Sequence, residues 1–127
     1  MSFTLRMGIP EMEGVWKDLL SKHESGALKG PDKPLFKKMV KTFRLLAVDP
    51  RHNSLQTHEI PELSRRYGEK VWQSYLENRT PAAGRIFWVY GPGKNEITII
   101  GLEPHPEDAK RNAYSRIRLS ELPPLDA

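Results

Sequence analysis

Alternation of apolar and polar residues predicts a strand at the start of the chain and a helix directly after it. Phe3, Leu5 and Met7 alternate with polar neighbours, as in a half-buried strand. Between Pro10 and Gly26, apolar residues recur at the i, i+3, i+4, i+7 and i+8 spacing of one helix face. Proline at the start and glycine at the end are typical of helix boundaries. The members of this face are Met12, Val15, Trp16, Leu19 and Leu20.

A second helix is expected from Asp32, a good N-cap residue, to the Asp49-Pro50 pair, where proline disfavours a further turn. Its apolar stripe consists of Leu35, Phe36, Met39, Val40, Phe43, Leu46 and Ala47. Residues 50–70 read mostly as loop, with at most a short helical turn after position 61.

Three further strands are expected at residues 71–76, 85–90 and 97–102. The Gly- and Pro-rich stretch 91–95 predicts a hairpin loop between the last two. The tail from residue 104 carries a short predicted helix around residues 108–116.

The order β-α-α-β-β-β indicates the α+β class, with two N-terminal helices packed on one face of a small antiparallel four-stranded sheet. A chain of 127 residues fits a single domain, 1–127, with its folded core at about 3–118 and a tail at 119–127. The expected core consists of Trp16, Leu19, Phe36, Met39, Phe43, Ile86, Trp88 and Ile99.

Composition narrows the classes of function. The chain has no cysteine, which excludes disulfides, thiolate metal sites and a cysteine nucleophile. It has neither an apolar run of the roughly 20 residues that a membrane helix needs nor a secretory leader pattern at its start. A cytoplasmic protein without a membrane partner is expected. The net charge of +4 and the isoelectric point near 9.4 favour an anionic partner.

Four cations share one face of the second predicted helix. They are spaced i, i+4, i+8 and i+11, without an intervening acid, and repel one another. A solvated helix face explains them, and so does a phosphate-bearing partner that relieves the repulsion. This basic stripe consists of Lys33, Lys37, Lys41 and Arg44.

Pairing across the predicted hairpin places candidate chemistry at one end of the sheet. If Tyr90 pairs near Ile97, Arg85 lies opposite about Leu102, close to His105. Tyr75 or Glu77 approaches Arg85 from its other side. In RNA cleavage a histidine can transfer the proton of the attacking 2′-hydroxyl or of the leaving oxygen, and arginine matches the charge on the phosphoryl oxygens. A surface ion pair of Arg85 is the alternative interpretation.

Other candidates carry weaker signals. His52 and His58 lie in the expected loop, without the spacing of a metal site, so no metal is expected. Either Trp72 or Tyr75 is expected to face solvent, where it could stack on a base.

Several motifs in series resemble those of the RelE/ParE superfamily of toxins. The segment LAVDPRHNSLQTHEI at 46–60 resembles a family run of the type DPRHPSLxTHKL, and VWQSYL at 71–76 resembles VWxSxV. GRIFW at 84–88 and IIGLEPH at 99–105 are similar to the family's next strands, YRIxW and ILxxGxH. Here Gln73 follows the motif tryptophan, where the family often has glutamate. The resemblance covers about residues 35–105.

This resemblance implies a ribosome-dependent endoribonuclease that cuts mRNA without a metal or other cofactor and is held inactive by a cognate antitoxin. It assigns phosphate stabilisation to Arg85, acid/base work to His105, assisting roles to His52 and His58, and stacking on the substrate to Tyr114. The basic stripe would contact ribosomal RNA. A ParE-type inhibitor of DNA gyrase and a non-catalytic RNA- or protein-binding homologue are the alternatives.

Overall fold

The computed structural model describes residues 2–77, 84–103 and 117–124. The expected helix around 108–116 and the candidates His105 and Tyr114 lie outside the described residues. In chain order the elements are β1 (Thr4–Met7), α1 (Glu11–Glu24), α2 (Asp32–Val48), the 3-10 turn η1 (Asn53–Leu55), β2 (His58–Glu59), α3 (Pro61–Tyr67), β3 (Trp72–Tyr75), β4 (Arg85–Tyr90) and β5 (Glu96–Glu103).

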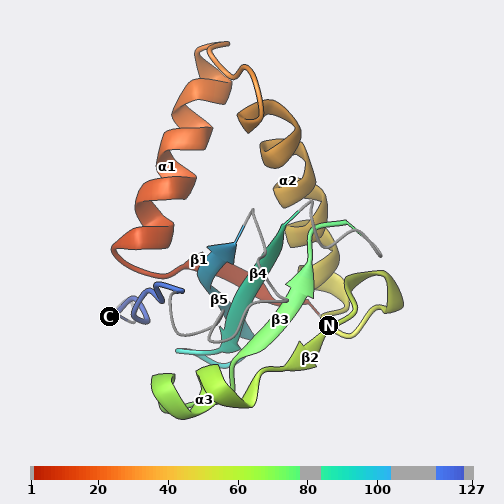
Figure 1. The fold of residues 1–127 in the computed structure, drawn as a ribbon, viewed down its shortest axis with the longest axis vertical. Coiled ribbons are helices and arrows are strands. Elements are labelled where there is room, and N and C mark those ends of the chain that lie inside the picture. The colour runs from red at the N-terminus through yellow and green to blue at the C-terminus, as the bar shows by residue number, and fades with distance from the viewer. Residues whose placement is uncertain (1, 78–83, 104–116, 125–127) are drawn as a thin grey trace.

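The strands form one five-stranded sheet in the order β1-β5-β4-β3-β2 (Figure 1). The α+β class is confirmed, but the expected four-stranded antiparallel sheet is wrong in two respects. β1 pairs with β5 in parallel, and β2 adds a strand at the opposite edge. A parallel pair needs a long connection, which the chain between β1 and β5 provides, and strand periodicity does not specify direction.

Residues 50–70 are more ordered than their sequence predicts. They contain η1, the two-residue strand β2 and the seven-residue helix α3. This helix begins at Pro61 and ends at Tyr67, and it is capped by Gly68, whose φ is 95°. Two residues are too few to show alternation, and two turns are too few to show a helical period, so the pattern read as loop.

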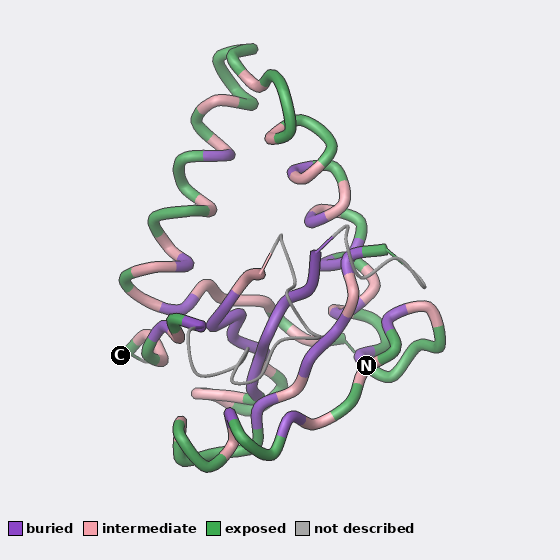
Figure 2. Tube along the Cα trace, in the orientation of Figure 1, coloured by how far each residue is buried: buried purple, intermediate pink, exposed green. Residues whose placement is uncertain are grey.

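Side chains pack on both faces of the sheet. α1 and α2 cover one face, and they contribute to the main core with residues such as Met39, Leu46, Ile86 and Trp88. α3 and the segment 117–124 cover the other face. The second core there contains Ile60, Leu63, Val71, Phe87, Val89, Ile100 and Ile117. Figure 2 shows the strands as the most continuously buried part of the chain.

The expected core is confirmed with one adjustment. Seven of its eight members are buried, whereas Trp16 is half-buried and packs against the core. Its ring is stacked on Phe36 at 5.4 Å and meets Phe43 edge-on at 5.1 Å.

A bulge corrects the predicted register by one residue. Tyr90 pairs with Ile97 as expected, but the register shifts between Phe87 and Trp88, so Arg85 faces Glu103 and not Leu102. One extra residue on β5 changes the alignment of everything beyond it.

α1 and α2 form a hairpin whose tip extends beyond the sheet, while α3 lies at the far end (Figure 1). Among the described residues, no helix is both long and apolar enough to cross a membrane.

A buried hydroxyl network attaches the chain after α2 to the sheet. The Thr57 hydroxyl donates to the Pro50 carbonyl at 2.7 Å. It must therefore accept from Ser74, whose Oγ lies 2.7 Å away. Ser74 in turn accepts from the Trp88 indole Nε1–H at 2.9 Å. Each proton has one acceptor, so the network fixes the position of the segment that leads into β2.

Replacement of Ser74 by alanine should therefore destabilise the fold. Trp88 Nε1 is buried and would lose its acceptor, at a cost of about 1–3 kcal/mol. Urea unfolding of Ser74→Ala and of wild type measures the difference. Ser21→Ala, on the exposed surface of α1, is the control and should stay within about 0.5 kcal/mol of wild type. Equal unfolding midpoints for all three proteins would contradict the network.

Candidate active site

Polar side chains from neighbouring strands meet on the sheet face opposite α1 and α2. His58 pairs with Gln73, Tyr75 with Arg85, and Arg85 with Glu103. Directly paired residues project to the same face, as do residues two apart on one strand. These five residues therefore share the face of the second core, and we call them the β-face cluster.

Arg85 is one of the two buried members of the β-face cluster, together with Gln73. It is 2% exposed, and its guanidinium carbon lies 5.7 Å from the centre of the Phe87 ring. Arg85 is therefore a buried side chain and not the surface residue that the alternative interpretation expected.

His58 lies on strand β2, and not in a loop as expected. Its Nδ1 is 2.9 Å from the Gln56 carbonyl oxygen, which can only accept a hydrogen bond. The proton of the neutral ring is therefore on Nδ1, and Nε2 is the basic nitrogen. Nε2 lies 3.5 Å from the Gln73 side-chain nitrogen, and the ring meets Tyr75 edge-on with 6.5 Å between centroids.

Gln56 has the backbone conformation that ends η1 just before β2. Its φ of 52° and ψ of 40° are left-handed, which is uncommon for residues other than glycine. Its backbone N–H and its side chain both donate to the Asn53 carbonyl, and the side-chain bond measures 3.0 Å. The turn places the Gln56 carbonyl beside the imidazole of His58.

His52 makes local contacts. Its Nδ1 accepts from the Ser54 backbone N–H at 3.1 Å and lies 2.8 Å from the Ser54 hydroxyl. These bonds cap η1, so the structure gives this exposed histidine a structural role. Of the two histidines, His58 is the one that belongs to the β-face cluster.

Trp72 and Tyr75 are both half-buried and lie on opposite faces. Trp72 stacks on Trp88 at 6.0 Å in the main core, and the Arg51 guanidinium lies 4.9 Å from the Trp72 ring centre. Tyr75 belongs to the β-face cluster.

Two members of the β-face cluster were not among the candidates predicted from sequence. Gln73 is buried and Glu103 is half-buried. A signal for Gln73 existed, because it stands two residues before Tyr75 on the same strand face and is polar within an otherwise buried strand. Glu103 became a neighbour of Arg85 through the bulge, which no periodicity shows.

The basic stripe lies on a different surface. All four of its cations are exposed, and they border a groove of about 1160 Å³ along the α1–α2 hairpin. Besides His23 and Gly26, apolar side chains make up the rest of its lining: Leu20, Leu28, Phe36, Val40, Leu45 and Val48. Since α2 covers the sheet face opposite the β-face cluster, the stripe and the cluster do not form one continuous site.

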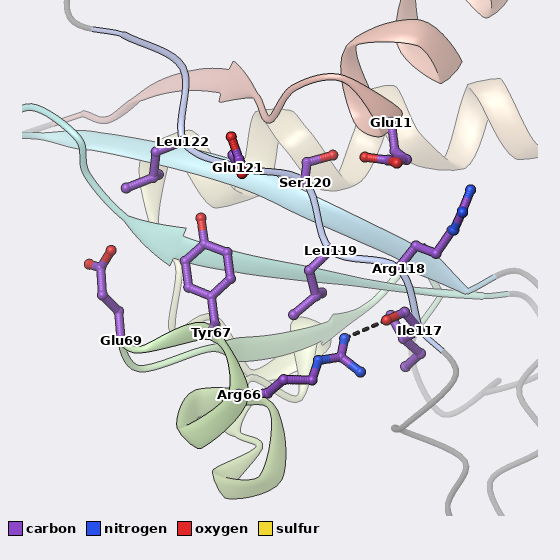
Figure 3. A pocket seen from close by; sticks show the side chains of 10 residues that line it. All are labelled: Glu11, Arg66, Tyr67, Glu69, Ile117, Arg118, Leu119, Ser120, Glu121 and Leu122. Carbon is purple, nitrogen blue, oxygen red and sulfur yellow. Dashed lines mark hydrogen bonds between the residues drawn. The ribbon is translucent and has the colours of Figure 1, made fainter.

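A second hollow, of about 610 Å³, lies between α3 and the segment 117–122 (Figure 3). Arg66 donates to the Ile117 carbonyl and joins the two walls. The pKa of Tyr67 is raised, first by burial and then by the carboxylates of Glu69 and Glu121. Its phenol therefore stays protonated at neutral pH and is not a base.

In the described parts of the chain, no group of three or more His, Cys, Asp or Glu side chains could hold a metal ion. The β-face cluster offers instead one histidine, one tyrosine, one arginine, one glutamine and one glutamate. This set contains a basic nitrogen, hydrogen-bond donors and a fixed positive charge, which are the groups that proton transfer and anion stabilisation require.

Comparison with protein-family models, with curated proteins and with solved structures gives no match for this chain. The RelE/ParE resemblance therefore rests on its motifs alone and stays a prediction.

Proposed function

We propose that this protein is a metal-independent endoribonuclease that cuts mRNA on the ribosome, in the manner of the RelE/ParE toxins that its motifs resemble. The observation that carries the proposal is the convergence of His58, Tyr75 and Arg85 from three neighbouring strands onto one face. The cytoplasm and a cognate antitoxin are the compartment and the partner that this function implies.

The proposed reaction begins at Nε2 of His58, which removes the proton of an RNA 2′-hydroxyl. The 2′-oxygen then attacks the adjacent phosphorus, and the bond from phosphorus to the 5′-oxygen breaks. The products are a 2′,3′-cyclic phosphate and a 5′-hydroxyl, whose oxygen takes up a proton from an acid. Tyr75 can supply that proton from within the β-face cluster, and His105, to which the resemblance assigns acid/base work, is the other candidate. Arg85 stabilises the negative charge on the phosphoryl oxygens.

Replacement of His58 by alanine should lower the single-turnover cleavage rate by about 10²- to 10⁴-fold, because proton transfer is lost. His52→Ala should cost far less, since the bonds of His52 are local. The assay is cleavage of a ribosome-bound message with chelator present. Equal losses in the two variants, or full activity of His58→Ala, would contradict the assignment of the base.

Arg85→Ala should lower the rate by about 10²- to 10³-fold, equivalent to about 3–4 kcal/mol of transition-state stabilisation. Arg85 is buried, so thermal unfolding of each variant must accompany the assay. Arg85→Lys keeps the charge without the two-pronged geometry and should fall between wild type and Arg85→Ala. A folded Arg85→Lys and a folded Arg85→Ala that both cleave at the wild-type rate would exclude arginine from the reaction.

Protein binding is the second candidate function, and the lining of the groove favours it. Apolar side chains between the cations suit a partner that has both acidic and apolar residues, whereas a phosphate backbone needs the cations only. The antitoxin of the first proposal or the target of a non-catalytic homologue would be such a partner. A ParE-type contact with gyrase belongs to the same class.

The triple variant Lys37→Ala, Lys41→Ala, Arg44→Ala separates the two uses of the groove. If the basic stripe binds RNA, the triple variant should bind RNA of every sequence more weakly than wild type does. The slope of log affinity against log salt should then flatten by about 0.7 for each single-strand phosphate that the variant no longer neutralises. Ribosome and RNA binding at several salt concentrations measures this. An unchanged affinity and slope would exclude the stripe from RNA binding.

A further inference from the structure

We propose that Gln73 is a positioning residue that holds the imidazole of His58 in a single tautomer, with its basic nitrogen directed at the β-face cluster. The claim for the tautomer stands by itself. Only its consequence for cleavage rests on the proposed function.

The two ring nitrogens of His58 face groups of opposite hydrogen-bonding sense. At Nδ1 the Gln56 carbonyl accepts at 2.9 Å, and at Nε2 the Gln73 amide nitrogen donates from 3.5 Å, the long end of the hydrogen-bond range. A neutral imidazole has one N–H and one lone pair. Only the tautomer with the proton on Nδ1 satisfies both neighbours.

The two partners differ in how firmly the protein holds them. His58 is exposed and lies on an edge strand of two residues, whereas Gln73 is 1% exposed and lies on β3, inside the sheet. The backbone pairing of these two residues brings the amide to the ring. The buried partner therefore restricts the exposed one, which would otherwise rotate about its side-chain bonds.

The amide of Gln73 is suited to a histidine that acts as a base. It donates to the lone pair of Nε2, which is the atom that a substrate 2′-hydroxyl must approach. A carboxylate in its place would accept from Nε2–H and select the other tautomer. The glutamine amide therefore orients the basic nitrogen while leaving its lone pair in place, and the substrate hydroxyl replaces the amide there when the 2′-hydroxyl proton is removed.

Nitrogen-15 NMR of ring-labelled histidine at a pH where the ring is neutral tests the tautomer directly. His58→Ala identifies the signals of His58. We expect wild-type His58 to carry its proton on Nδ1. Gln73→Met, of similar size without a donor, keeps the Gln56 carbonyl at Nδ1 but should show a larger share of the Nε2–H tautomer than wild type. Gln56→Gly keeps the carbonyl and tolerates the left-handed backbone, so it should retain the wild-type pattern.

A wild-type His58 with its proton mainly on Nε2, or identical tautomers in a folded wild type and a folded Gln73→Met, would overturn the proposal. If Gln73→Met does not fold, Gln73→Glu keeps the size and presents an acceptor to Nε2, so it should increase the N–H character of that nitrogen. An unchanged Nε2 signal in that variant would overturn the proposal equally.

Cleavage then tests the consequence. Gln73→Met should lower the single-turnover rate by about 10- to 100-fold, the range for groups that orient a functional histidine from outside, with RNA affinity within about twofold of wild type. An unchanged rate despite a changed tautomer would remove Gln73 from the mechanism. Absence of cleavage in wild type, with the Nδ1 signal present, would refute the proposed function and leave the positioning role intact.

Discussion

The antiparallel pairing of β3 with β4 is the constraint on which the candidate site depends. β4 is the middle strand, and it is buried on both faces from Arg85 to Val89. A slip of one residue would exchange the two faces and place Trp88 in the second core and Phe87 in the main one. Because the two cores differ in size and in their neighbours, packing fixes the register, and the pair Tyr75–Arg85 is fixed with it.

Because side chains alternate along a strand, supporting residues lie on one face of the sheet and candidate site residues lie on the other. Thr57 and Ser74 lie in the hydroxyl network that ends at Trp88 of the main core. Their immediate neighbours along the chain, His58, Gln73 and Tyr75, belong to the opposite face. A network buried under α2 thus holds an exposed histidine in place on the far side of the sheet. Rigid support of this kind is what a base needs if its nitrogen is to stay within reach of a substrate proton.

The same sheet separates the groove of the helical hairpin from the β-face cluster, because they lie on opposite sides of it. The helical hairpin presents cations and apolar residues around its groove, while the β-face cluster gathers proton-transfer groups with one buried cation. If both surfaces serve the proposed function, the groove suits a large partner, and the cluster suits one phosphodiester. The separation also means that a variant in one surface can be interpreted without the other.

The sequence by itself determined the elements with clear periods. These are α1, α2, β1, β3 and the β4–β5 hairpin with its Tyr90–Ile97 pairing, together with the main core and the α+β class. A helical stripe or a strand alternation is a local consequence of one buried face, so it can be seen in one stretch of chain. The same local patterns predicted that Tyr75 lies close to Arg85.

Only the tertiary structure decided which residues join Arg85 and Tyr75 in the β-face cluster. β2 has two residues and no period, the parallel pairing of β1 leaves no mark on its alternation, and the bulge that brings Glu103 to Arg85 occupies a single position. His58 read as a loop residue because its strand exists only through pairing with Gln73. Each of these features arises from contacts between segments far apart in the chain, and such contacts are set by packing and not by local pattern.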